Sequence, residues 1–253
     1  MSEEQQQPSK ADDLLFLADL MKRIQRPKDG LELMEELANL KPSFNEIERS
    51  SFGAIFKAAV DNIRSSLRVL TDNLINEEEK GNTDFADNIK QVINETFSDL
   101  QKLCNRTLKI IDDCLLPNAE SVKAKVFFLK LKGDIFRYIS EYAEGEEKEK
   151  ALSGADEAYL AAIPLSKSDL VKSDPVRLGL ILNFAVFKYE HMQAHEEAKE
   201  LLTDAIGLVK DDFSDLSNPD TVKEAESIIE VMQSNLENWD EMLGEDEEED
   251  EES

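Results

Sequence analysis

Apolar residues recur at every third or fourth position along most of the chain, which places them on one face of an α-helix. The longest stretch with this spacing runs from about residue 43 to residue 76. Its apolar positions form one stripe, made of Phe52, Ile55, Phe56, Ala59, Val60, Ile63, Leu67 and Leu70. No stretch shows the strict apolar–polar alternation of a β-strand. The pattern therefore predicts an all-α fold.

Short polar segments rich in glycine, proline and asparagine separate the periodic stretches and predict about nine antiparallel helices. Residues 26–30 divide two short helices that precede residue 42. The longer helices are expected at residues 43–76, 85–115, 120–143, 147–166, 174–192, 195–211 and 219–241. Ser43, followed three residues later by Glu46, is the expected N-cap of the first long helix. Pro164 is expected to end or kink its helix, because proline lacks a backbone N–H.

The two ends of the chain differ from this helical part. Residues 1–8 are polar and expected to be flexible, residues 9–243 form the helical domain, and residues 244–253 form an acidic tail that is expected to be disordered. The net charge is −27, and residues 245–252 carry eight consecutive negative charges. A surface this negative repels the phosphates of nucleic acids and of anionic membranes, so we expect the protein to bind neither.

The two cysteines, Cys104 and Cys114, are expected to stay reduced. Ten residues separate them on one predicted helix, which is about 15 Å along its axis, whereas a disulfide tolerates roughly 7 Å between Cα atoms. No apolar segment after a basic start indicates a signal peptide, and no run of about 18 apolar residues indicates a transmembrane helix. Reduced thiols and the missing signals predict a cytoplasmic protein.

Positive side chains gather in two places in this acidic chain. Lys57, Arg64 and Arg68 share one face of the predicted long helix, since seven and eleven residues both return to within about 20° of the start. Asp61 is close enough on that helix to pair within the stripe. A second cluster contains Lys130 and ends at Arg137 and Tyr138. Guanidinium groups and a tyrosyl hydroxyl suit a phosphate, although spacing alone favours ordinary surface charges paired with the abundant acids.

Longer stretches carry a more specific signal than any spacing does. They are Arg64–Val69, Pro117–Asn118, Lys125–Asp134, Arg137–Tyr138, Arg177–Phe187 and Asn235–Trp239. In residue identity, order and approximate spacing, these stretches resemble signature segments of the 14-3-3 family. The resemblance covers residues from about 40 to 241. It implies nine antiparallel helices, usually assembled as a cup-shaped dimer with a groove in each subunit. It also implies a non-enzymatic adaptor without a cofactor, which binds phosphoserine or phosphothreonine in client proteins.

The resemblance assigns roles to individual residues. The residues that match the family's phosphate-binding group are Lys57, Arg64, Arg137 and Tyr138. The amides that match those holding the peptide backbone are Asn183 and Asn235, flanked by Glu190 and Trp239. The apolar side of the groove matches Leu182, Val186 and Val231, and a further basic groove residue matches Lys130.

The sequence departs from the family pattern at several of these surfaces. Ile63 and Leu67 stand where the family usually has arginine and tryptophan, and Asn238 replaces an apolar groove residue, so we expect an altered affinity or peptide preference. In the dimer region, Arg26 and Asp99 can still form one of the family's intersubunit pairs. Asp29 would instead face the like-charged Glu95, and Pro27 occupies the turn beside it. We therefore expect a homodimer that is weak or atypical.

The acidic tail offers a self-ligand for a basic groove. Tethering raises its effective concentration, so even weak binding would occupy the site. Ser253 follows a run of acids, a context that acid-directed kinases favour, and its phosphorylation would strengthen this autoinhibition. A tail that only keeps the protein dispersed explains the same composition equally well.

Two other classes of function remain open. One is a helical scaffold that binds unmodified protein partners and has a degenerate phosphate pocket. The other is an enzyme, because His191 and His195 lie one helical turn apart and could face a metal. The sequence lacks the His-Glu-x-x-His arrangement and the glycine-rich phosphate loop of such enzymes. Exposed helix histidines are the better interpretation, so we expect no enzymatic activity and no metal.

Overall fold

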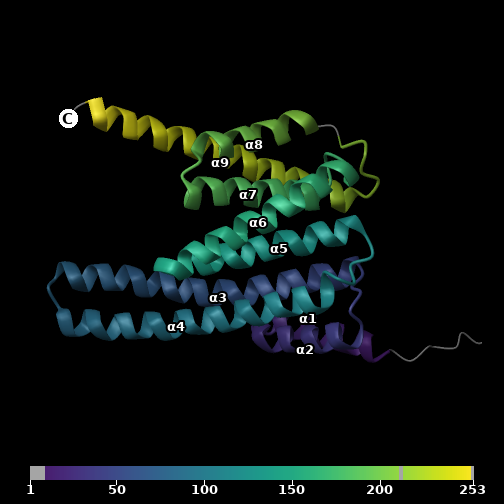
Figure 1. Ribbon diagram of the computed structural model, residues 1–253, viewed down its shortest axis with the longest axis horizontal. Helices are drawn as coiled ribbons and strands as arrows, with labels where there is room; N and C mark the ends of the chain where they lie inside the picture. Colours follow the sequence, from purple (N-terminus) through teal and green to yellow (C-terminus); the bar gives the residue numbers. More distant parts are fainter. Residues whose placement is uncertain (1–8, 211–212, 252–253) are drawn as a thin grey trace, which may run out of the picture. The chain divides into compact units, whose positions relative to one another are not determined.

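The computed structural model describes residues 9–210 and 213–251, with side chains up to residue 241. These residues form nine α-helices and one short π-helical turn. The helices are α1 (Lys10–Arg23), α2 (Pro27–Leu40), α3 (Glu46–Glu79), α4 (Thr83–Ile110), α5 (Val122–Ser140), α6 (Gly145–Asp169), α7 (Pro175–Met192), α8 (His195–Val209) and α9 (Pro219–Glu251), and the turn η1 is Ile111–Leu115 (Figure 1). This part of the chain contains no strand, which confirms the predicted all-α fold. Within it, no helix has an apolar stretch long enough to cross a membrane.

Local sequence sets where the long helix α3 begins, but not at the residue that the spacing predicts. Asn45 is the N-cap, and its side chain accepts a hydrogen bond from the Glu48 backbone N–H at 3.0 Å. The Glu48 carboxylate accepts in return from the Asn45 backbone N–H at 2.7 Å. The predicted capping box of Ser43 and Glu46 is therefore wrong by two residues. The same motif recurs two residues later with an asparagine, which caps helices at least as well as serine does.

Of the two effects expected of Pro164, an end or a kink of its helix, the first is wrong, because α6 does not end there. It continues to Asp169, so the proline lies inside the helix near its C-terminal end. Proline removes the bond to the carbonyl four residues earlier, which belongs to Leu160. Leu160 is 51% exposed, so the lost bond lies on the solvent side of the helix. The loss is therefore tolerable at this position.

The backbone of α9 runs to Glu251. The disorder predicted for residues 244–253 stays a prediction. Residues 1–8, predicted to be flexible, and Ser253, a predicted phosphorylation site, lie outside the described residues.

The chain divides into two compact units, and the division falls within α5 and within α6. The first unit comprises residues 1–120 and 138–148, and the second comprises residues 121–137 and 149–253.

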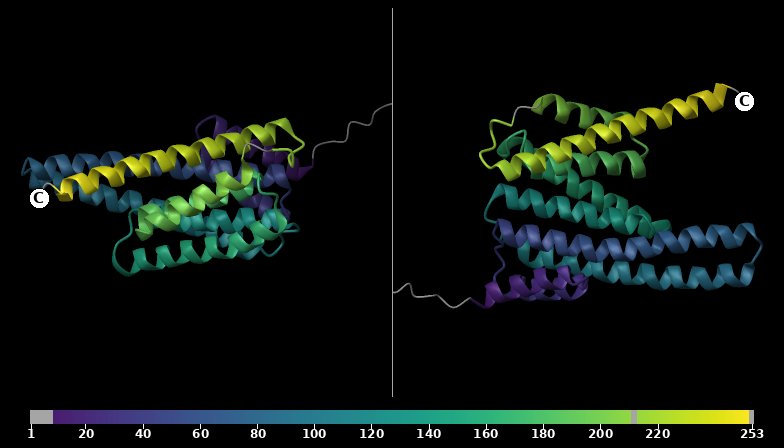
Figure 2. Two further views of the ribbon diagram at one scale, coloured as in Figure 1. Left: turned by 90° about the horizontal axis from the view of Figure 1, so that it is seen from above. Right: turned by 180° about the vertical axis from the view of Figure 1, so that it is seen from behind.

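In the first unit, α1 packs on α2 and α3, and α3 and α4 run side by side (Figure 2). Gly30 lets α2 approach α1 closely, because an added Cβ would lie 2.8 Å from the Ala18 carbonyl oxygen. The buried stripe of α3 contains every predicted residue except the half-buried Leu70, and is made of Phe52, Ile55, Phe56, Ala59, Val60, Ile63 and Leu67. Ile63 and Leu67, where the resemblance expects arginine and tryptophan, are thus core residues of this unit.

In the second unit, α7 packs on α8 and α9 around an apolar cluster that includes Ala185, Leu202 and Met232. A second cluster of the same unit is centred on Tyr159 of α6, whose ring lies 5.4 Å from Phe184 and 5.7 Å from Phe187. Gly133 of α5 faces this tyrosine, and a Cβ added there would lie 2.5 Å from the ring. The glycine is therefore needed for the close approach of α5 and α6.

The two cysteines are free thiols, as the sequence predicts, and we expect them to differ in reactivity. Burial raises the pKa of Cys104 to about 12, and the negative charge of Glu141 adds to this effect. Only the thiolate is a nucleophile, so the buried thiol is unreactive at pH 8. A thiol reagent at pH 8 should label the half-buried Cys114 quickly and Cys104 only after denaturation. Two fast thiols in the native protein, or one fast thiol in Cys114→Ser, would contradict this assignment.

Candidate functional site

Arg64 of α3 is held in a fixed geometry within the first unit. Its Nε and Nη2 atoms donate to the two carboxylate oxygens of Glu141 at 2.7 and 2.8 Å. Its Nη1 atom lies 3.4 Å from Asp61, so the pairing of Asp61 within the cationic stripe is confirmed. The side chain is 14% exposed. A guanidinium held by two oxygens of one carboxylate loses little further freedom when it binds an anion.

Tyr138, near the end of α5, supports the same guanidinium from one side. The Arg64 guanidinium carbon lies 4.5 Å from the centre of the Tyr138 ring, a cation–π arrangement. The tyrosine is buried and packs in turn on Phe56 of α3. Lys57 is exposed on α3 about two turns before Arg64. The first unit therefore brings Arg64 and the Tyr138 ring together and carries Lys57 on the same helix as Arg64.

Glu141 is a partner of Arg64 that the sequence analysis did not identify. It lies in an acidic stretch after Tyr138, and no spacing distinguishes it from the glutamates around it. Its partner Arg64 is 77 positions away in the chain. Only the folded contact between α3 and the segment after α5 gives this carboxylate its role, which is to orient and partly neutralise Arg64.

The second unit gathers other predicted residues around Asp134, which the sequence analysis also missed. Its Oδ1 atom accepts hydrogen bonds from the Tyr159 hydroxyl at 2.6 Å and from Asn183 Nδ2 at 2.7 Å. Its Oδ2 atom accepts from Lys130 Nζ at 2.7 Å. The signal available in the sequence was the four-residue spacing of Lys130 and Asp134 on one helix, which permits an ion pair.

Opposing effects act on the ionisation of Asp134, and the charged form wins. Burial favours the neutral acid, but attraction to Lys130 and then to Arg137 outweighs it and holds the pKa of Asp134 below its usual value. Burial and the neighbouring Asp134 raise the pKa of Tyr159, so its hydroxyl stays protonated and donates. Three of the predicted site residues, namely Lys130, Arg137 and Asn183, therefore surround one buried carboxylate.

The remaining predicted groove residues of this unit lie on α7 and α9. Leu182 and Val186 are half-buried against the α7–α9 core, Asn235 is half-buried, and Val231 is 46% exposed. Glu190 and Asn238 are exposed. Trp239 is buried, and its ring stacks on Tyr189 at 4.2 Å between centroids, so it is a core residue.

The two histidines have aromatic neighbours and are half-buried, so the interpretation as exposed helix histidines is wrong. The His191 ring lies 5.9 Å from Phe187, and the His195 ring stacks on Tyr189 at 4.4 Å. Within the described residues, no three side chains of histidine, cysteine, aspartate or glutamate are grouped so that they could hold a metal ion.

The predicted dimer residues have partners within their own chain, and all but the half-buried Asp29 are exposed. Arg26 Nε lies 2.5 Å from Asp29, Glu95 accepts a hydrogen bond from Gln91 at 2.9 Å, and Asp99 accepts one from Lys102 at 3.1 Å. The like-charged encounter of Asp29 and Glu95 between subunits stays a prediction.

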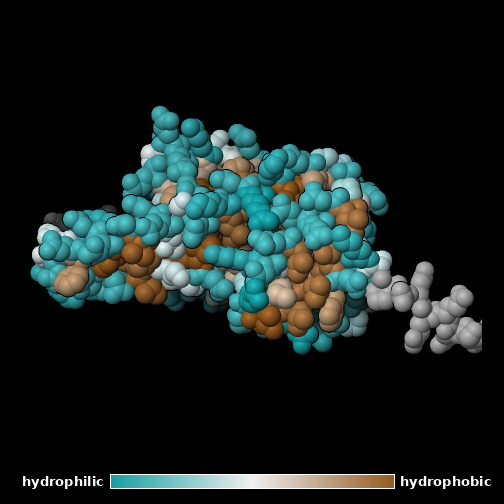
Figure 3. All heavy atoms as spheres, turned by 90° about the horizontal axis from the view of Figure 1, so that it is seen from below, coloured by the Kyte–Doolittle hydropathy of each residue, from teal (hydrophilic) through white to brown (hydrophobic). Residues whose placement is uncertain are grey.

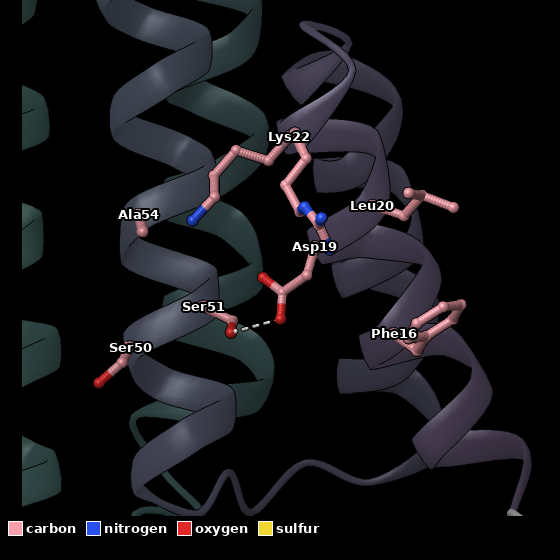
Figure 4. A pocket seen from close by; sticks show the side chains of 8 residues that line it. Phe16, Asp19, Leu20, Lys22, Ser50, Ser51 and Ala54 are labelled. Carbon is pink, nitrogen blue, oxygen red and sulfur yellow. Dashed lines mark hydrogen bonds between the residues drawn. The ribbon is translucent and has the colours of Figure 1, made fainter.

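The first unit also has two surface hollows. A cleft of about 510 Å³ between α1 and α3 is lined by Phe16, Asp19, Leu20, Lys22, Arg23, Ser50, Ser51 and Ala54. In Figure 4, Asp19 points toward α3, where the Ser51 hydroxyl donates to it at 3.2 Å, whereas Phe16 and Leu20 point away from α3. A shallower groove of about 470 Å³ along α3 and α4 is lined by Leu70, Asn73, Glu77, Phe85, Asn88, Ile89 and Val92. Figure 3 shows apolar surface over the α1–α2 pair and toward the α3–α4 turn.

The predicted site residues thus fall into two groups. Lys57, Arg64 and Tyr138 belong to the first unit, and Lys130, Arg137, Asn183 and Asn235 belong to the second. The convergence of Arg64 and Arg137 on one phosphate stays a prediction.

Comparison with known proteins identifies relatives over nearly the whole chain. The family model described as 14-3-3 protein matches residues 17–240. The chain is 33% identical to the 14-3-3-like protein GF14 epsilon of Arabidopsis thaliana, over 91% of each protein. It is 31% identical to the checkpoint signal transducer rad24 of Schizosaccharomyces pombe, over 90% of this chain and 84% of the relative. It is 32% identical to the 14-3-3 protein beta/alpha-A of Xenopus laevis, over 90% of this chain and 92% of the relative.

Proposed function

Because the chain belongs to the 14-3-3 family of non-enzymatic adaptors, we propose that it binds segments of client proteins that carry phosphoserine or phosphothreonine. The observation that carries this proposal is the Arg64 guanidinium, fixed by Glu141 and by the Tyr138 ring in a largely buried setting. A phosphorylated side chain brings about −1.5 to −2 charges and three strong acceptor oxygens. A guanidinium that is already oriented favours the binding of such an anionic ligand, even in an otherwise acidic protein.

We propose that the other predicted residues contact an extended phosphopeptide. Lys57, Arg137 and the Tyr138 hydroxyl add cationic or hydrogen-bonding contacts to the phosphate. Asn183 and Asn235 supply amides for the peptide backbone, and Leu182, Val186 and Val231 supply an apolar side. An amphipathic groove of this kind accepts many sequences that share one phosphate. The acidic surface disfavours nucleic acids and anionic membranes as partners, and the free thiols favour a cytoplasmic location.

A titration with matched peptides tests this function. The probe is a peptide pool with a fixed central phosphoserine and randomised flanks, compared with the same pool containing serine. Charge-assisted hydrogen bonds contribute about 1.5–3 kcal/mol each, so two such contacts predict at least a roughly 100-fold preference for the phosphorylated pool. Calorimetry measures both affinities. Equal affinities would favour a helical scaffold that binds unmodified partners.

We further propose that the acidic tail competes with clients for the basic site. Deletion of residues 245–253 removes eight consecutive negative charges and should raise phosphopeptide affinity in the same titration. Full-length protein phosphorylated at Ser253 should bind the peptide more weakly than unmodified protein. Identical affinities for all three forms would leave the tail only a role in keeping the protein dispersed.

We also propose that the protein forms a homodimer through its first unit. The apolar surface over α1 and α2 and the groove along α3 and α4 are two faces that a second copy could cover reciprocally. Repulsion between Asp29 and Glu95 should weaken the assembly, so we expect dissociation at micromolar concentrations. Sedimentation velocity over a dilution series measures it, and Asp29→Lys should tighten the dimer. A dimer that persists at nanomolar concentrations would contradict this expectation.

A further inference from the structure

Asp134 joins three helices of the second unit through one buried carboxylate. It lies on α5, accepts from Tyr159 of α6 and from Asn183 of α7, and pairs with Lys130 on its own helix. Only 4% of the residue is exposed. A carboxylate this deeply buried is costly unless its oxygens are satisfied, and here each oxygen accepts at least one hydrogen bond. Its position is therefore fixed by the packing of all three helices.

This carboxylate determines which way the Asn183 amide faces. An asparagine side chain carries a donor NH₂ and an acceptor oxygen, and a half-turn about its last bond exchanges them. An ionised carboxylate only accepts, so the NH₂ group must face Asp134, as the 2.7 Å contact from Nδ2 records. The reversed amide would place two oxygens against each other. The depressed pKa of Asp134 keeps this constraint in force at neutral pH.

We propose that Asp134 is a positioning residue that locks the Asn183 amide with its Oδ1 acceptor directed away from α5, ready for a backbone N–H of a bound peptide. This inference rests on the proposed function for the identity of the ligand, but the locked amide is a property of the free protein. It predicts that the peptide position opposite Asn183 must carry an N–H, so an N-methylated residue or a proline there is disfavoured.

The free protein tests the lock without any ligand. The probe is the Asn183 side-chain NH₂ resonance pair in a nitrogen–proton correlation spectrum, assigned with Asn183→Ala. In the wild type, the proton that faces Asp134 should be shifted downfield and protected from exchange with solvent. In Asp134→Asn, which keeps the size of the side chain, both features should be lost. An Asn183 pair that is the same in the two proteins would overturn the proposal.

A second variant keeps the test decisive if Asp134→Asn does not fold. Tyr159→Phe removes the phenol that donates to the same Oδ1 atom and retains the ring that fills the core. The Asn183 bond should then shorten, and its proton should move further downfield. An unmoved resonance would show that Asp134 does not control the amide.

A double-mutant cycle tests whether the fixed orientation of the Asn183 amide contributes to phosphopeptide affinity. Asp134→Asn should weaken phosphopeptide binding about three- to tenfold when Asn183 is present, the effect of one neutral hydrogen bond, and should have a much smaller effect in the Asn183→Ala background. Asp240→Asn is the matched control, because it makes the same substitution in another ion pair of the second unit, the pair with Lys199. Its effect should be equal in both backgrounds.

The outcomes separate the two proposals. Wild-type protein that does not prefer phosphorylated peptide would sink the proposed function, while the resonance of the free protein would still decide the lock. Wild-type protein that prefers phosphorylated peptide, combined with equal effects of Asp134→Asn in both backgrounds, would sink the positioning role alone.

Discussion

Arg64→Ala is expected to lower phosphopeptide affinity about 100-fold, because the loss of one buried, charge-assisted contact costs about 2–5 kcal/mol. Two effects combine in this variant. The phosphate loses a guanidinium that is already oriented by Glu141 and Tyr138, and Glu141, itself 15% exposed, is left as a negative charge without its guanidinium partner. Calorimetry with the best phosphorylated peptide and its unphosphorylated counterpart measures the loss.

Arg106→Ala is the matched control for this prediction. Arg106 lies on α4 of the same unit, and its guanidinium also pairs with two carboxylates, those of Glu32 and Glu35. The variant changes the net charge by the same amount but removes a more exposed pair, for which we expect less than a twofold change in affinity. Arg64→Lys should cause an intermediate loss of affinity, because an ammonium group keeps the positive charge but lacks the bidentate geometry of a guanidinium. Similar losses for Arg64→Ala and Arg106→Ala would indicate a general effect of charge rather than a phosphate site.

Gly133→Ala is expected to destabilise the protein by about 3 kcal/mol, the upper part of the range for overpacking a core. The new Cβ would lie 2.5 Å from the ring of Tyr159, which is fully buried between Phe184 and Phe187 and has nowhere to move. Any shift of that ring also strains its hydrogen bond to Asp134. Thermal unfolding followed by circular dichroism should show the midpoint falling by roughly 6–12 °C.

Gly207→Ala provides the opposite expectation from the same substitution. Gly207 lies inside α8, and no atom lies within 4 Å of a Cβ added there. Alanine should therefore stabilise this helix by about 0.5–1 kcal/mol, because glycine is a poor helix former. If the two variants unfolded at the same temperature, steric contact with Tyr159 would not be the reason for glycine at residue 133.

The fold was largely predictable from local patterns. The errors concern where individual helices begin and end. The apolar stripe of α3 matched the observed core because periodicity alone defines which face is buried. The N-cap of that helix was predicted at Ser43 and lies at Asn45. Ser43 with Glu46 and Asn45 with Glu48 both have the residue types of a capping box, so residue type alone does not decide between them. Helix α6 continued through Pro164 because a single lost hydrogen bond near an exposed helix end is a small cost.

The candidate site depended on a different kind of information. Linear order was enough to locate the cations, the amides and the membership of the family, because these are properties of residue type and spacing. It could not single out Glu141 or Asp134 among so many acidic residues, since each acquires its role from a partner 77 or 49 positions away. Which carboxylates orient the binding groups depends on distances through space, and these exist only once the helices have packed.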